Sequence, residues 1–174
     1  MATQSLIDRT KTAVILMDYQ IEGLNRFPAE FQKEILRKAN EVLAKARSEH
    51  IPVIYVEVVR GERTPEIEIH PDIAPKQSEF VLTKHRVGPF STTNLDEVLK
   101  KQNIETVVIM GIQTGNSVLS GVCWAADIGY KLIVISDCCA DRDVEVHRFL
   151  TERVLLRRAS VITSQEFLRV MEKA

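Results

Sequence analysis

The sequence has few residues of the kinds that mark specialised structural classes. Its three cysteines, Cys123, Cys138 and Cys139, show neither zinc-site nor redox spacing, and an odd number argues against a disulfide framework. Reduced thiols are typical of the cytoplasm. No apolar run approaches the roughly 20 residues of a membrane helix, and residues 1–9 acquire charge too early for a signal peptide. We therefore predict a cytoplasmic protein that does not span a membrane.

The chain also lacks a dominant charge. Its 23 basic and 24 acidic residues give a net charge of −1, and no run of Lys and Arg is long enough to follow a phosphate backbone. We therefore expect no nucleic-acid partner. With 174 residues, of which 45% are hydrophobic, the chain is long enough for one packed core. We predict a single domain over residues 1–174.

Short apolar runs alternate with segments of helical periodicity. This alternation predicts an α/β fold, in which a mostly parallel, open sheet of about six strands lies between two layers of helices. The predicted strands are 12–18, 52–59, 80–84, 105–110, 131–136 and 160–163, and the predicted helices are 29–49, 94–102, 116–129, 144–158 and 164–173. The segment 60–79 has three prolines and no sustained period, so we expect a long loop that covers the site or forms a subunit contact.

Three chemically complementary residues stand at the ends of predicted strands. Asp18 ends the first apolar run, Lys84 follows another, and Ser117 opens the helix after residues 106–110. Each alone has an ordinary explanation as a turn cap, a surface lysine or a helix cap. Because ligands bind at the carboxyl ends of strands in such sheets, the three together favour a shared site. A hydroxyl at a helix N-terminus also lies where an oxyanion is readily held.

The segments around these residues resemble the isochorismatase-like (cysteine hydrolase) superfamily over nearly the whole chain. The resemblance is carried by Asp18-Tyr19-Gln20, by Thr83-Lys84 and by the run from Gly111 to Val118. It implies that Asp18 is the base, that Lys84 is its electrostatic partner and that position 117 holds the nucleophile. It also implies a cis peptide near Ile112-Gln113, with an oxyanion held by the backbone of Gln113 and Ser117, and a homo-oligomer, either a dimer or a tetramer.

Position 117 departs from the family pattern, because that family uses a cysteine where this chain has a serine. A thiol with an ordinary pKa of about 8.5 ionises readily, whereas a hydroxyl must lose its proton during attack. Asp18 is a poor base for this step unless burial raises its pKa. Three interpretations remain open: a Cys-to-Ser substitution that traps substrate, a working Ser–Lys–Asp variant, and a relative that has lost catalysis.

The expected pocket contains neither a metal nor an organic cofactor. Phe27, Phe90 and Arg60 are candidates for its walls, with Trp124 as a further aromatic candidate. Metal-using relatives resembling nicotinamidases carry Asp-x-His after the second strand, and these ligands are missing here. We therefore predict a metal-free hydrolase of a small amide or a related C–N or C–O substrate. The alternative is a non-catalytic relative that binds a small molecule or a protein partner.

Overall fold

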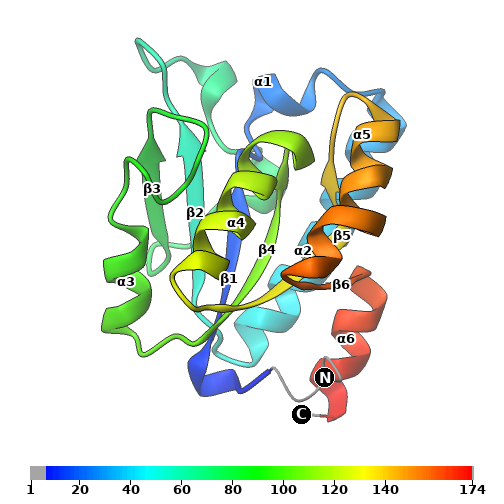
Figure 1. Ribbon diagram of the computed structural model, residues 1–174. Coiled ribbons are helices and arrows are strands. Elements are labelled where there is room, and N and C mark those ends of the chain that lie inside the picture. Colours follow the sequence, from blue (N-terminus) through cyan, green and yellow to red (C-terminus); the bar gives the residue numbers. More distant parts are fainter. Residues whose placement is uncertain (1–6, 174) are drawn as a thin grey trace.

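The computed structural model describes residues 7–173, which form a six-stranded sheet with helices on both faces (Figure 1). Residues 1–6 and 174 lie outside the described part. The predictions of a single domain over residues 1–174 and of no signal peptide both extend to these residues. Neighbouring strands are parallel, in the order β3-β2-β1-β4-β5-β6, so the predicted fold class is confirmed. The strands are β1 (Thr12–Met17), β2 (Val53–Val58), β3 (Phe80–Lys84), β4 (Thr106–Ile112), β5 (Lys131–Ala140) and β6 (Ser160–Ile162).

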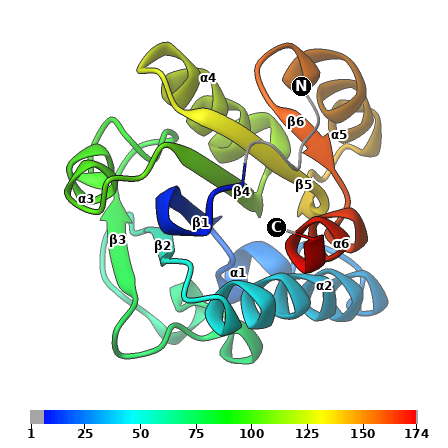
Figure 2. The ribbon, with the colours of Figure 1, turned by 90° about the horizontal axis from the view of Figure 1, so that it is seen from below.

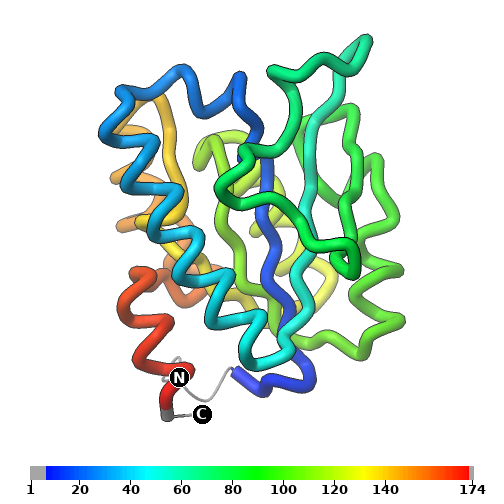
Figure 3. Tube along the Cα trace, turned by 180° about the vertical axis from the view of Figure 1, so that it is seen from behind, coloured from blue at the N-terminus to red at the C-terminus, as the bar shows by residue number. Residues whose placement is uncertain are grey.

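The helices form two layers that cover the sheet. Figure 2 shows α1, α2 and α6 on one face and α3, α4 and α5 on the other, and Figure 3 shows α2 and α6 side by side. None of the helices within residues 7–173 is long and apolar enough to cross a membrane. The helices are α1 (Ile21–Leu24), α2 (Ala29–Ser48), α3 (Leu95–Lys101), α4 (Leu119–Asp127), α5 (Val144–Phe149) and α6 (Ser164–Lys173).

Continuous apolar runs become the central strands because helices cover both faces of the sheet. All six residues of β1 are buried. Helix α2 presents one apolar stripe to the sheet, as its periodicity predicts. The buried members of this stripe are Ile35, Leu36, Ala39, Val42, Leu43 and Ala46. Phe31, which the periodicity also places on this stripe, is 43% exposed and stacks on Phe27 instead.

The strand order reverses between β1 and β4. The chain builds β1, β2 and β3 to one side and then returns to place β4 on the other side of β1. Ligands bind at such a reversal, beyond the carboxyl ends of the strands. The two strands approach closely at Gly111, where a Cβ atom would lie 2.9 Å from both the Cβ and the carbonyl oxygen of Met17. A residue larger than glycine would force the two strands apart at this point.

The bounds of two predicted elements differ most from the structure. Strand β5 continues to Ala140 instead of ending at residue 136, because its pairing with β4 resumes at Cys139 after a register shift around the polar Ser136 and Asp137. The predicted helix 144–158 consists of α5, a π-helical turn (Leu150–Val154) and a 3-10 turn (Leu155–Arg157). Because β5 ends at Ala140, the residues that follow it lie next to the site.

The long segment 60–79 is anchored to the body of the protein. It contains two 3-10 turns, Pro65–Ile67 and Pro71–Ile73. The Tyr55 hydroxyl donates a hydrogen bond to the carbonyl of Ile73 at 2.8 Å, and the Gln20 side chain donates one to the carbonyl of Ile67. These bonds satisfy the last carbonyl of each turn and tie the segment to β2 and to the residues after β1.

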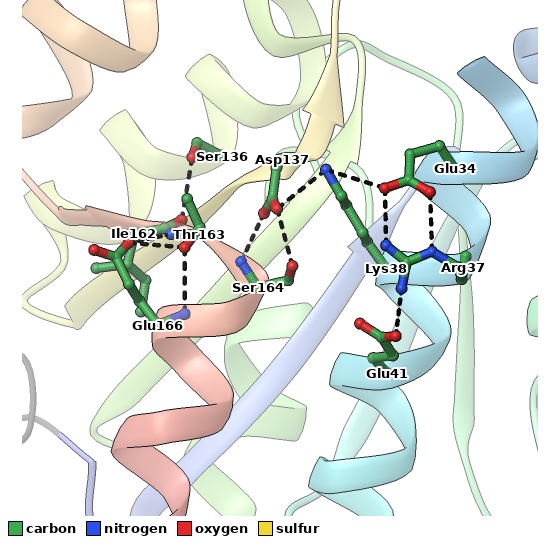
Figure 4. Close-up of polar contacts among 10 residues, drawn as sticks. All are labelled: Glu34, Arg37, Lys38, Glu41, Ser136, Asp137, Ile162, Thr163, Ser164 and Glu166. Atoms are coloured by element: carbon green, nitrogen blue, oxygen red, sulfur yellow. Dashed lines mark hydrogen bonds and ion pairs between the residues drawn. The ribbon is translucent and has the colours of Figure 1, made fainter. Parts of the chain in front are cut away.

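Asp137 in β5 connects α6 and α2 to the sheet (Figure 4). Its carboxylate accepts hydrogen bonds from the Ser164 backbone N–H at 2.6 Å and the Ser164 hydroxyl at 2.9 Å, and Lys38 Nζ lies 3.4 Å away. Ser164 is fully buried, so it depends on this carboxylate for its hydrogen bonds. Thr163 and Glu166 exchange bonds in the pattern of a capping box, which fixes the first turn of α6.

We expect Asp137→Ala to lower the free energy of unfolding by about 1–3 kcal/mol, because the buried donors of Ser164 would lose their acceptor. Chemical denaturation of the purified variant measures this loss. Glu172→Ala, an exposed change on the same helix, is the matched control and should have no measurable effect. Equal stability of the two variants would show that Asp137 does not anchor α6.

Candidate active site

The carboxyl ends of three strands bring Asp18, Lys84 and Ser117 into contact. Asp18 follows β1 with a positive φ of 58°, and its N–H donates to the Val56 carbonyl at 2.9 Å. Lys84 is the last residue of β3. Ser117 lies in a π-helical turn (Thr114–Val118) between β4 and α4. The predicted helix from residue 116 therefore begins as this wider turn, which presents Ser117 to the other two side chains.

The ammonium group of Lys84 is at the centre of this arrangement. Lys84 is 1% exposed, and its Nζ lies 2.7 Å from Asp18 Oδ2, 2.6 Å from Ser117 Oγ and 2.8 Å from the carbonyl oxygen of Val87. An ammonium group has three N–H donors, so these three acceptors satisfy it completely. Because Ser117 Oγ accepts from Lys84, its own hydrogen is free to point at Asp18 Oδ2, with which it is in contact.

Burial makes the Asp18 carboxylate more basic than an exposed one. Burial raises the pKa of Asp18, although Lys84, the Ser117 hydroxyl and the charge of Arg60 all oppose this rise. Asp18 Oδ1 is buried and has no hydrogen-bond partner among the described residues. One carboxylate oxygen therefore holds Ser117 and Lys84, while the other has an unused lone pair.

The turn that carries Ser117 is fixed from the far side by residues that follow β5. The Gly115 N–H donates to Asp141 Oδ2 at 2.7 Å, and Thr114 Oγ1 lies 2.8 Å from His147 Nδ1. Burial lowers the pKa of His147, which favours the neutral ring at this contact. Sequence reasoning assigned neither residue to this turn, and it missed Asp141 because it ended β5 at residue 136. The correct strand end would have placed Asp141 beside the site.

The peptide bond between Ile112 and Gln113 is cis, as the family resemblance implies. Gln113 lines the site, and its side-chain Oε1 accepts a hydrogen bond from Asn116 Nδ2 at 2.9 Å. The Gln113 carbonyl accepts from the N–H groups of Asn116 at 3.1 Å and Val118 at 3.4 Å. These contacts hold the backbone between β4 and Ser117 at the edge of the cavity.

A cavity of about 600 Å³ opens above the three residues. Its size suits a small molecule. Arg60 lines it, as expected, whereas the aromatic candidates do not: Phe27 stacks on Phe31 with ring centroids 5.3 Å apart, and Phe90 is buried in the core. Trp124 is 45% exposed on α4 and does not line it either. The lining is Asp18, Gln20, Glu22, Gly23, Arg26, Val58, Arg60, Ile67, Lys84, Val87, Ile112, Gln113, Asn116, Ser117 and Arg142.

Sequence reasoning missed much of this wall. Arg26 follows the short helix α1, which has no clear sequence signal, and Arg142 follows the misplaced end of β5. Arg60 and Ile67 show that the beginning of segment 60–79 does contribute to the cavity. The first residues of this segment therefore form part of the cavity wall.

The described cysteines and histidines lie outside the cavity. Cys138 and Cys139 are buried in β5, and burial raises the pKa of both thiols, that of Cys139 to about 12, so neither is a thiolate at neutral pH. Cys123 lies in α4 and is a free thiol. Within residues 7–173, no group of three or more His, Cys, Asp or Glu side chains is placed to hold a metal ion. The groups that meet at the end of the three strands are a carboxyl, an ammonium and a hydroxyl.

Comparison with known proteins agrees with this architecture. The model of the isochorismatase domain matches residues 12–166, which is most of the chain. The chain belongs to the isochorismatase family. A cysteine hydrolase from Pseudomonas syringae pv. phaseolicola shares the fold with a TM-score of 0.89, at 23% identity over 97% of this chain and 95% of that one.

Two further relatives indicate the range of the family. N-carbamoylsarcosine amidase from Thermoplasma acidophilum has a TM-score of 0.77 and 27% identity, covering 88% of this chain and 96% of that one. A secreted isochorismatase effector, Isc1, from Verticillium dahliae is 32% identical over 112 residues, which are 60% of this chain and 59% of the relative. The chain therefore matches about three fifths of that relative's length.

We expect Asp18→Asn and Lys84→Met each to lower the free energy of unfolding by about 3–5 kcal/mol, because each leaves a buried partner uncompensated. The double variant should lose clearly less than the sum of the two, since it removes the pair together. Denaturation of the four proteins gives this coupling energy.

The pair of Lys11 and Glu105 is a matched control for this cycle. Its atoms are 2.6 Å apart, but the side chains are 45% and 48% exposed. Its single variants should have much smaller effects, because water screens exposed charges. Losses at Asp18 and Lys84 that are strictly additive would contradict an ion pair between them.

Proposed function

We propose that this protein is a hydrolase that cleaves a small amide or a related C–N or C–O bond with Asp18, Lys84 and a nucleophile at position 117. The observation that carries the proposal is the contact of Ser117 Oγ with both Lys84 Nζ, at 2.6 Å, and Asp18 Oδ2. A nucleophile beside a base, with a cation next to both, is the arrangement that covalent catalysis requires. The family's cysteine hydrolases and the N-carbamoylsarcosine amidase support the reaction class.

In the proposed first half-reaction, the Ser117 hydroxyl attacks the substrate carbonyl and its proton passes to Asp18. The negative charge that develops on the carbonyl oxygen is held by backbone N–H groups of Gln113 and Ser117. The C–N bond then breaks, the leaving nitrogen takes the proton from Asp18, and an ester to Ser117 remains. Lys84 stays protonated throughout and stabilises the anions formed beside it.

In the second half-reaction, Asp18 takes a proton from a water molecule that attacks the ester. The bond to Ser117 Oγ breaks and this oxygen recovers the proton, so a carboxylic acid leaves and the site returns to its first state. The raised pKa of Asp18 makes it a better proton acceptor than an ordinary carboxylate. Since the base must be ionised, kcat/KM should fall as the pH falls through this raised pKa.

The second candidate function is the binding of a small molecule or a protein partner without turnover. The Ser117 hydroxyl itself favours it. A hydroxyl is a weaker nucleophile than the thiolate of the cysteine hydrolases, and a buried ion pair beside it is also compatible with a purely structural role.

The cytoplasm remains the proposed compartment, because the three cysteines are free.

We further propose that the protein forms a homo-oligomer, either a dimer or a tetramer. Apolar side chains on α5 and the turns after it support this proposal: Val144 is 71%, Phe149 61% and Leu156 54% exposed. Large exposed apolar side chains gathered along one segment are typical of protein–protein contacts.

The exchange Ser117→Cys separates the functional interpretations. A thiol beside Lys84 should have a lowered pKa and react with alkylating agents. Both forms are assayed against a panel of small amides and esters. Turnover by the cysteine form alone identifies a quiescent hydrolase site, and turnover by Ser117 identifies a serine hydrolase. If neither form turns over any substrate, the binding protein is the better explanation.

Two controls belong to this assay. Asp18→Ala in the cysteine background should abolish turnover, with the fold checked by circular dichroism. Exhaustive chelation should leave the activity of both forms unchanged, and a stoichiometric metal recovered from the purified protein would overturn the metal-free mechanism.

Light scattering at micromolar concentration should give the mass of at least a dimer. Phe149→Glu should shift the protein towards the monomer, because a charge would be buried at the contact. Ile128→Glu, directly after α4, is the matched control: its side chain is 41% exposed, and the exchange should leave the mass unchanged. A monomeric unmodified protein would refute the proposed oligomer.

A further inference from the structure

The charged groups that line the cavity do not balance. Its lining contains four basic side chains and two acidic ones, an excess of two positive charges. Two pairs are neutral: Lys84 with Asp18 at 2.7 Å, and Arg26 with Glu22 at 2.5 Å. The excess therefore belongs to the remaining two side chains, Arg60 and Arg142.

Neither of these arginines has an ion-pair partner within residues 7–173. No carboxylate oxygen of the described chain lies within 4.0 Å of either guanidinium, and both residues are exposed. Arg63, three residues after Arg60, shows the contrast, because it is bound to the buried carboxylate of Glu57. The chain thus neutralises a nearby arginine but leaves those of the cavity without a counter-charge.

The two arginines stand on opposite flanks of the reacting groups. Arg60 follows β2 and Arg142 follows β5. Between them lie β1 and β4, the strands that lead to Asp18 and Ser117. The positive charge of Arg60 opposes the rise in the pKa of Asp18, so this charge acts at the reacting end of the cavity. A small molecule whose carbonyl lies at Ser117 therefore extends towards a guanidinium on either side.

We propose that the substrate carries a carboxylate in addition to the bond that is cleaved, and that Arg60 and Arg142 select it by this charge. This inference rests on the proposed function for the site of cleavage and adds the class of substrate. A guanidinium presents a planar pair of N–H donors that matches a carboxylate, and its charge is permanent. The cavity of about 600 Å³ suits a short-chain acid rather than a polymer.

Half-amides of unbranched dicarboxylic acids, from oxamate to glutaramate, test this inference when each is paired with the neutral diamide of the same acid. The two members of a pair offer the same amide and differ in one charge. Calorimetry with the unmodified protein measures binding, and ammonia release by the serine and cysteine forms measures hydrolysis. We expect at least one half-amide to bind roughly ten- to hundredfold more tightly than its diamide, with a preference that weakens as salt is added.

Arg60→Gln and Arg142→Gln identify the residues responsible. Each should reduce the preference for the half-amide over the diamide by roughly tenfold, whereas Arg157→Gln, an exposed arginine outside the cavity, should leave it unchanged. Equal binding of the charged and neutral members across the series, or a preference that survives both variants, would overturn the inference.

The two proposals fail in different ways. If half-amides bind selectively but no form releases ammonia, the charge selection stands and the hydrolase proposal fails. If neutral amides are hydrolysed as well as charged ones, the hydrolase proposal stands and the charge selection fails. Tighter binding of inorganic phosphate than of every half-amide would also reject the carboxylate as the selected group.

Discussion

The buried ammonium group of Lys84 is the constraint on which the site depends. An ion removed from water costs several kcal/mol unless other groups replace its hydration. Here the replacement is complete, because Asp18, Ser117 and the Val87 carbonyl use its three donors. Each of these groups must stay in place for Lys84 to remain buried as a cation. The contacts that position the base and the nucleophile therefore also contribute to the stability of the fold.

The order of the strands determines where these three side chains meet. Asp18 and Ser117 follow β1 and β4, which are neighbours in space but are separated in sequence by the two strands built on the other side. The close approach at Gly111 keeps the ends of these strands together. Lys84 arrives from β3, two strands away from β1, and its long side chain spans the gap. A shorter basic side chain at this strand end would not meet both partners.

The sequence predicted the parts of the structure that have strong periodic or positional signals. Continuous apolar runs predicted β1 and β4, and the helical stripe predicted α2, because burial on both faces or on one leaves a clear pattern. Strand ends then placed Asp18, Lys84 and Ser117 near one another. The cis bond before Gln113 followed only from the family resemblance, because no local pattern predicts it.

The parts that the sequence did not predict lack such signals. Polar Ser136 and Asp137 interrupted the pattern of β5, so the groups after its true end, Asp141 and Arg142, were not assigned to the site. The sequence does not show which way an aromatic side chain points. Phe27 and Phe90 in fact pack away from the cavity. The side chains that give the cavity its charge lie on short or irregular segments, where contacts rather than periodicity decide position.

The backbone of Asp18 bears on how such a site persists over evolutionary time. Its φ of 58° is a left-handed conformation, which costs an ordinary residue about 1–2 kcal/mol and which glycine adopts freely. Neighbouring groups impose this conformation, since the Tyr19 hydroxyl is bonded to the Cys138 carbonyl and the Tyr19 carbonyl to the His70 N–H. In a lineage that no longer used the carboxylate, drift to glycine at this position would relax the backbone. Because that change would also leave the buried Lys84 without its counter-charge, the carboxylate and the lysine would have to be lost together.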